Sequence, residues 1–213
     1  MRRLFAFSLL VSIWPRAASA QEGAAETNYV PQVERRSGFS IGLDFGLGLG
    51  SYTGYPNEVE KINNPEYRSS TGAALASGYS IWLGGALRDW LTVGAGLFTA
   101  GGGDGDVMGG GGAFGMHIEA FPLFALGGNL RDLGMISEFG AGSGALRDKD
   151  GEETANGGNM SFIGLGAFFE PWQFWQMSHG PLVMYKAEFS DTMTSNTLLA
   201  GWRMAFYWTQ KGG

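Results

Sequence analysis

Several features are missing from this chain of 213 residues, and each absence excludes a class of protein or site. It has no cysteine, which excludes disulfides, thiolate nucleophiles and cysteine-based metal sites. After residue 20, no stretch reaches the ~18 continuous apolar residues of a membrane-spanning helix. Lysine is scarce between the polar segments, whereas the exterior of a soluble sheet usually carries many charged side chains. Stability must therefore come from backbone pairing and packing.

Glycine is the residue in excess, at 37 of 213, or about 17% against a usual ~7%. The glycines follow no collagen-like period, and aromatic residues make up 14% of the chain. Neither a collagen helix nor a disordered chain fits this composition. The glycines are therefore expected in strands, loops and tight interiors.

The first twenty residues have the layout of a secretory signal peptide. Arg2 and Arg3 precede an apolar run over residues 4–14, and Ala18-Ser19-Ala20 is a small-residue cleavage site. Cleavage removes three of 14 Lys+Arg and no acid, which leaves 11 against 20 Asp+Glu and a net charge of −9. Such an acidic protein is a poor candidate for binding nucleic acid, which requires basic surfaces.

Alternation of large apolar residues with small or polar ones carries the fold prediction. Over residues 39–49, every odd position is a large hydrophobe and every even position is Gly, Ser or Asp. That period indicates a strand with two unlike faces. The pattern recurs over residues 72–87, 90–100, 112–124, 133–144, 159–170, 181–190 and 197–209. Eight strands of roughly ten residues or more match the length that crosses a bilayer at a steep tilt.

The predicted connections alternate in length. Polar segments over 51–71, 101–111 and 146–158 are long, whereas Arg88-Asp89 and Gly127-Gly128-Asn129 are short turns. Outer-membrane barrels divide extracellular loops from periplasmic turns in this way.

Tyrosine and tryptophan gather near the ends of the predicted strands, where aromatic girdles meet lipid headgroups. These residues are Tyr79, Trp82, Trp90, Trp172, Trp175, Trp202, Tyr207 and Trp208. The connection over 171–180 is long for a periplasmic turn and contains two tryptophans, so we interpret it as an interfacial aromatic segment. The alternative is that the aromatic residues fill an ordinary core.

Together these features resemble the small eight-stranded outer-membrane barrels, the class of the OmpA transmembrane domain and OmpX. The likeness covers nearly the whole mature chain and lies in architecture, not in a sequence fingerprint. The predicted fold is all-β, an eight-stranded antiparallel transmembrane β-barrel over 38–213, after a signal peptide over 1–20 and a flexible periplasmic lead over 21–37. A soluble β-sandwich or lipocalin-like barrel with its apolar faces turned inward is the alternative fold.

The resemblance also implies a place in the cell and a set of partners. The location is the cell outer membrane, with both termini in the periplasm. The partners are outer-membrane lipid and lipopolysaccharide, and the assembly machinery that inserts barrels. The surface ligand is unknown from the sequence.

Charged residues on the small-residue faces form a candidate polar network in the lumen. Its members are Asp44, His117, Glu119, Glu138, Lys186, Glu188 and Arg203. Asp44 and Arg203 lie at matching depth on the first and last strands, which must pair to close a barrel. Charges are tolerated in the lumen because they meet partners there, while charges facing lipid are costly. We therefore predict a packed ion-pair network.

A catalytic or metal site is the less favoured interpretation. His117 and His179 are the two available imidazoles, no serine lies two positions from His117, and the adjacency of Ser178 to His179 is common by chance. The acidic clusters over 104–106 and 148–153 do not fit a calcium-loop spacing. We expect no enzyme activity, no cofactor and no metal site.

The sequence favours a structural or surface-interaction role: membrane integrity, adhesion or protection through the three long loops. A narrow pore for small solutes or ions is the first alternative, although Trp82, Phe98 and Phe168 on the inner face argue against a continuous wet path. An outer-membrane lipid A-modifying enzyme is the second alternative.

Overall fold

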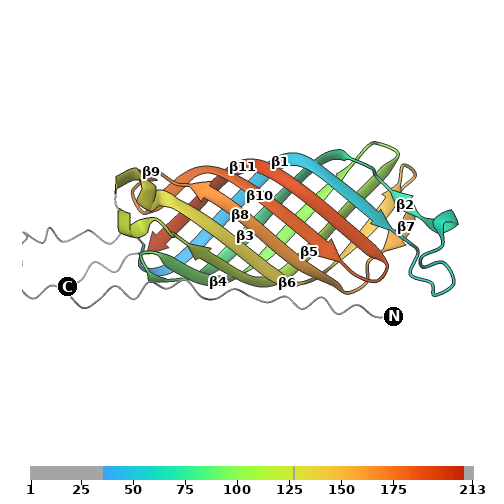
Figure 1. The fold of residues 1–213 in the computed structure, drawn as a ribbon, viewed down its shortest axis with the longest axis horizontal. Coiled ribbons are helices and arrows are strands. Elements are labelled where there is room, and N and C mark those ends of the chain that lie inside the picture. Colours follow the sequence, from blue (N-terminus) through green and yellow to red (C-terminus); the bar gives the residue numbers. More distant parts are fainter. Residues whose placement is uncertain (1–35, 127, 209–213) are drawn as a thin grey trace, which may run out of the picture. The chain divides into compact units, whose positions relative to one another are not determined.

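The computed structural model describes residues 36–126 and 128–208. The predicted signal peptide and residues 21–35 of the predicted lead lie outside the described residues. Eight long strands close into one antiparallel barrel (Figure 1). They are β1 (Gly38–Gly54), β3 (Ala74–Arg88), β4 (Leu91–Gly103), β5 (Val107–Ala120), β6 (Leu133–Asp148), β8 (Met160–Phe169), β10 (Met177–Phe189) and β11 (Met193–Trp208). Strand β11 closes on β1 in continuous register from Phe39↔Trp208 to Gly54↔Met193, which confirms the predicted fold.

The barrel turns its apolar face outward. Leu47 and Leu49 on β1 are 72% and 61% exposed, and Leu75 on β3 is 77% exposed. A soluble sandwich or lipocalin-like barrel would bury these side chains, so that alternative is wrong. No helix among the described residues has the length and apolar character needed to cross a membrane.

Apolar side chains fill the lumen at several depths. The buried clusters are Tyr52, Leu146, Ala155, Met160 and Met193; Phe98, Ala113 and Phe162; Phe121, Ile136, Phe168, Leu182 and Met184; and Trp82, Ala86, Ala205 and Tyr207. Inward glycines leave the space for the largest of them. A Cβ at Gly42 would overlap the Trp82 ring, and one at Gly134 would overlap the Phe168 ring. The glycine excess thus follows in part from closing a narrow barrel around bulky side chains.

The two ends of the barrel differ, and we name them the loop end and the terminal end. At the loop end the connections span 55–73, 104–106, 149–159 and 190–192, and they include η1 (Pro65–Tyr67), β2 (Ser69–Ser70) and β7 (Glu153–Asn156). At the terminal end they span 89–90, 121–132 and 170–176, and they include η2 (Phe124–Leu126), η3 (Gly128–Asp132) and β9 (Trp172–Phe174). Short strands β2 and β7 extend the wall at the loop end by pairing with β1 and β6 (Figure 1).

The predicted loop over 101–111 is wrong, because strands occupy most of it. β4 continues to Gly103 and β5 begins at Val107, with Gly101↔Gly110 and Gly102↔Gly109 paired in register. A run of glycines has no side chains to alternate, so the period that reveals a strand disappears although the backbone still pairs.

Two other predicted connections also change length. The loop over 146–158 is shorter, because β6 reaches Asp148 and pairs with β7. The turn at Gly127-Gly128-Asn129 is longer: β5 ends at Ala120, and the connection over 121–132 contains two 3-10 helices.

Candidate functional site in the barrel lumen

All seven residues of the predicted lumen network point into the barrel. Each is at most 2% exposed: Asp44, His117, Glu119, Glu138, Lys186, Glu188 and Arg203. Their strands place them there because they alternate with outward apolar neighbours, such as Met116 and Ile118 around His117. The alternation of side chains along the strands therefore brings these charged groups and the imidazole into one enclosed space.

Arg203 is the centre of the network. Its Nη1 lies 2.6 Å from Glu119 Oε1 and 3.3 Å from Asp44 Oδ1, and its Nε lies 3.3 Å from Glu170 Oε2. Asp44 is also its register partner across the β1–β11 seam, and the guanidinium packs 4.2 Å above the Phe168 ring. One guanidinium thus contacts three buried carboxylates through two of its nitrogens.

His117 lies between two glutamates. Its Nε2 is 2.6 Å from Glu119 Oε1, and its Nδ1 is 3.1 Å from Oε1 of Glu138, its register partner on β6. The ring stacks on Trp82, with centroids 4.4 Å apart. The imidazole is therefore fixed on both edges and on one face.

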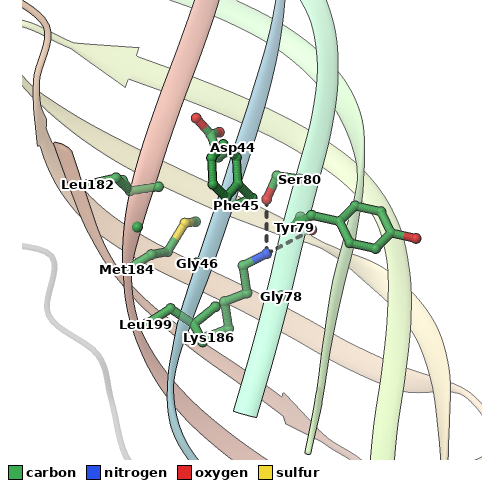
Figure 2. Close-up of a pocket in the computed structure, with 11 residues that line it drawn as sticks. Asp44, Phe45, Gly46, Gly78, Tyr79, Ser80, Leu182, Met184, Lys186 and Leu199 are labelled. Atoms are coloured by element: carbon green, nitrogen blue, oxygen red, sulfur yellow. Dashed lines mark hydrogen bonds between the residues drawn. The ribbon is translucent and has the colours of Figure 1, made fainter. Parts of the chain in front are cut away.

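Lys186 has neutral partners instead of the predicted carboxylate. Its Nζ donates to Ser80 Oγ at 2.9 Å and to the carbonyl oxygen of Tyr79 at 3.1 Å (Figure 2). It also donates to the carbonyl oxygen of Thr99 at 3.2 Å. Among the described residues, no carboxylate oxygen lies within 4.0 Å of it, so the ion-pair prediction is wrong at this position. A cavity of about 10 Å³ beside Asp44 and Lys186 has room for one water molecule.

Glu188 is held separately from the central cluster. Its Oε2 accepts a hydrogen bond from Ser195 Oγ at 3.0 Å. Gly111 on β5 leaves the space for this carboxylate, because a Cβ there would overlap its Oε2 atom.

Sequence reasoning missed a second cluster at the terminal end. Arg36 Nε lies 2.7 Å from Glu170 Oε1, its Nη2 lies 3.0 Å from Asp132 Oδ1, and its guanidinium lies 3.6 Å above the Phe121 ring. Arg36 is only 1% exposed, so the prediction of a flexible lead is wrong at this residue. Glu170, which also contacts Arg203, links the two arginines.

Ser178 and His179 do not form a nucleophile–base pair. They are consecutive on β10 and therefore point to opposite faces. Ser178 is buried at 1% exposure, while the His179 ring lies 5.9 Å from both Trp172 and Trp202 on the outer face. Trp172 and Trp202 stack on each other at 5.4 Å, consistent with the predicted aromatic segment at this end.

The loop end is acidic. Its acidic residues are Glu58, Glu60, Glu66, Asp104, Asp106, Asp148, Asp150, Glu152, Glu153 and Asp191, and its basic residues are Lys61, Arg68, Arg147 and Lys149. Backbone N–H groups of Val107 and Asp106 donate to Asp104 and hold the pKa of its carboxyl below the ordinary value. A groove of about 490 Å³ crosses the ends of β5, β6 and β7, with Arg147, Glu153 and Asn156 among its lining residues.

The closed strand ring, the outward apolar face and the filled interior define a small eight-stranded β-barrel of the outer-membrane type. No protein-family model and no curated protein sequence matches the chain.

Several solved structures are similar to it. Neisserial surface protein A has a TM-score of 0.48 and 9% identity, over 78% of this chain and 96% of that one. Ail, the attachment invasion locus protein of Yersinia pestis, has a TM-score of 0.44 and 11% identity, over 80% and 99%. The outer membrane protein OprG from Pseudomonas aeruginosa has a TM-score of 0.41 and 10% identity, over 81% and 98%. The fold assignment itself rests on the strand pairing and exposed faces described above.

Proposed function

We propose that this barrel resides in the bacterial outer membrane and has a structural or surface-interaction role exercised at its loop end. The observation that carries the proposal is a packed lumen combined with a wall that continues beyond the apolar band. On β1 and β11 the outward residues change from the pair Leu49↔Leu198 to Ser51↔Asn196 and Thr53↔Thr194. A polar, acidic rim above a lipid-facing band is the form of a protein that presents its loops to the medium.

The packing of the interior favours this role over a narrow pore. Tyr52, Trp82 and Phe98 are buried to 1% exposure or less in separate clusters. A conducting path would have to pass all three side chains, together with the Arg203 and Arg36 clusters.

Enzymatic modification of lipid A is less well supported. His117 has no exposed surface, and a base acting on a lipid needs access to it. His179 faces outward, whereas the adjacent Ser178 is buried on the inner face of β10.

The difference between the connections at the two ends suggests an orientation in the membrane and a set of partners. We place the loop end outside the cell and the terminal end in the periplasm, because extracellular loops are the longer and more polar set. The neighbours of the band are outer-membrane lipid and lipopolysaccharide. The acidic rim favours a surface partner of basic character.

The absence of cysteine permits a direct test of orientation. Asp150→Cys at the loop end and Asn129→Cys at the terminal end each create one thiol, and intact cells are treated with a membrane-impermeant maleimide. Labelling is expected at position 150 and not at position 129. The reverse result, or equal labelling of both, overturns the proposed orientation.

The role itself is tested in cells that lack the protein and carry either the wild type or a rim variant. The rim variant is Asp148→Asn with Asp150→Asn, Glu152→Gln and Glu153→Gln. Cells that carry the rim variant should adhere less to a basic surface than cells that carry the wild type. Sensitivity to detergent should rise only in cells that lack the protein. Altered lipid A in cells lacking the protein would favour the enzyme instead.

A further inference from the structure

Three carboxylates lie near His117 in the buried interior. Asp44, Glu119 and Glu138 are each at most 2% exposed, and among the described residues Arg203 forms ion pairs with Asp44 and Glu119. Because uncompensated charge is strongly unfavourable in an enclosed site, these carboxylates must be neutralised by protons or by further cations.

The carboxylates around His117 keep oxygen atoms without hydrogen-bond partners. Asp44 Oδ2, Glu119 Oε2 and Glu138 Oε2 are buried and accept no hydrogen bond within the described residues. One donor atom from each of Asp44, His117 and Glu138 lies within 4.8 Å of the other two. An imidazole nitrogen and two carboxylate oxygens are thus gathered in one small volume, and the side chains of Asp44 and Glu138 each keep one buried oxygen without a partner among the described residues.

The surroundings of His117 resemble those of a metal-binding histidine. A metal-binding histidine usually donates its other ring N–H to a carboxylate, and His117 Nε2 lies 2.6 Å from Glu119 Oε1. Glu119 is itself oriented by Arg203 Nη1 at 2.6 Å. When Nε2 alone carries the proton, Nδ1 directs its lone pair toward Glu138 Oε1 at 3.1 Å. Two acceptors at that distance need a proton or a cation between them.

We propose that Asp44, His117 and Glu138 bind one divalent first-row transition-metal ion inside the lumen, with Glu119 as the positioning residue for the imidazole. One imidazole with carboxylates suits Zn²⁺ or Mn²⁺. Zinc–ligand bonds of ~2.0–2.2 Å hold ligand atoms about 3.5 Å apart, so any of the three separations that approaches the 4.8 Å bound must shorten when the ion binds. The two positive charges of the ion compensate the carboxylates of Asp44 and Glu138.

Neighbouring groups accommodate such an ion and retain it. Arg203 is bound to Asp44 through Oδ1, which leaves Oδ2 for the metal. The ring of Trp82 covers one face of His117, so the site is enclosed. An enclosed position predicts a stabilising ion that exchanges slowly, not a transported one.

Zinc binding by the refolded barrel tests the proposal. The full chain without residues 1–20 is refolded in detergent with ZnCl₂, freed of unbound metal and analysed by mass spectrometry of the element. One zinc per barrel is expected. Asp44→Asn and Glu138→Gln should each lower zinc affinity at least tenfold, and Glu119→Gln should lower it by about 10- to 100-fold.

Two controls separate this site from other acidic groups. Glu188→Gln alters a buried carboxylate outside the cluster, and Asp104→Asn alters the acidic rim. Both should retain one zinc. Equal binding by the wild type and by folded Asp44→Asn or Glu138→Gln overturns the proposal.

A spectroscopic measurement decides the question even if those variants do not fold. The chain has two histidines, so His179→Gln leaves His117 as the one imidazole for nitrogen NMR. Zinc should shift Nδ1 strongly while Nε2 keeps its proton. A ring that remains protonated on both nitrogens with Zn²⁺ present would show that a proton, and not a metal, neutralises the cluster.

Discussion

At the scale of single residues, Arg203 forms ion pairs with three buried carboxylates. It touches Glu119, Asp44 and Glu170, none of which is more than 2% exposed. Removing the guanidinium takes the arginine partner from Asp44 and Glu119 in a site closed to water, and leaves Glu170 with Arg36 alone of the two arginines. The cost therefore arises mainly from the groups left behind.

Arg203→Met should lower the free energy of unfolding by about 3–5 kcal/mol. Urea unfolding in lipid vesicles, followed by tryptophan fluorescence, measures the loss. Arg147→Met is the matched control, because Arg147 lies on the exposed rim and should change stability by no more than about 0.5 kcal/mol. Equal effects of the two substitutions would contradict the account.

Arg36 and Glu170 should be energetically coupled. Glu170 accepts from Arg36 at 2.7 Å, so a double-mutant cycle with Arg36→Met and Glu170→Gln should give a coupling free energy of about 0.5–3 kcal/mol. The same unfolding assay supplies all four measurements. Additive effects would show that Arg36 and Glu170 do not interact.

At the scale of strands, glycine has two roles that depend on the direction in which its Cβ would point. Gly115 faces inward on β5, and a Cβ there would overlap the carbonyl oxygen of Phe139. Gly112 on the same strand faces outward, where the nearest atom to a Cβ would be Phe98 O at 3.6 Å. The inward position 115 therefore has no room for a side chain, whereas the outward position 112 does.

Alanine substitution at these two positions tests the distinction. Gly115→Ala should destabilise the barrel by about 1–3 kcal/mol through overpacking. Gly112→Ala should be neutral or stabilise it by up to about 1 kcal/mol, because glycine is unfavourable within a strand. Urea midpoints of the refolded variants provide the measurement, and a larger loss at Gly112 would contradict the assigned faces.

The elements also show where sequence reasoning works and where it stops. Alternation located the eight strands because each carries enough large side chains to mark two faces. It failed at Gly101 and Gly110, where pairing continues without side chains. Arg36 had no signal at all, because its partners Asp132 and Glu170 are distant in the chain and meet it only when the barrel closes. The sequence pattern was enough to assign the lumen residues to a face. It could not predict the distances between their side chains or which of their oxygen atoms lack partners.

At the scale of the whole molecule, closure provides the stability that a chain without disulfides needs. Every long strand pairs with two neighbours, so no long edge exposes unpaired backbone groups to lipid. The packed interior adds a functional consequence. The purified barrel should show no steady conductance in a planar bilayer, and a stable open level would favour the pore.

Heat modifiability on an SDS gel, applied to separated cell fractions, tests whether the chain forms an outer-membrane barrel. We expect a band confined to the outer-membrane fraction that runs at different positions in unboiled and boiled samples, because the closed barrel resists SDS until heated. A protein released with the soluble periplasmic fraction, with no shift on boiling, would contradict this expectation and would mean that the apolar faces do not meet lipid.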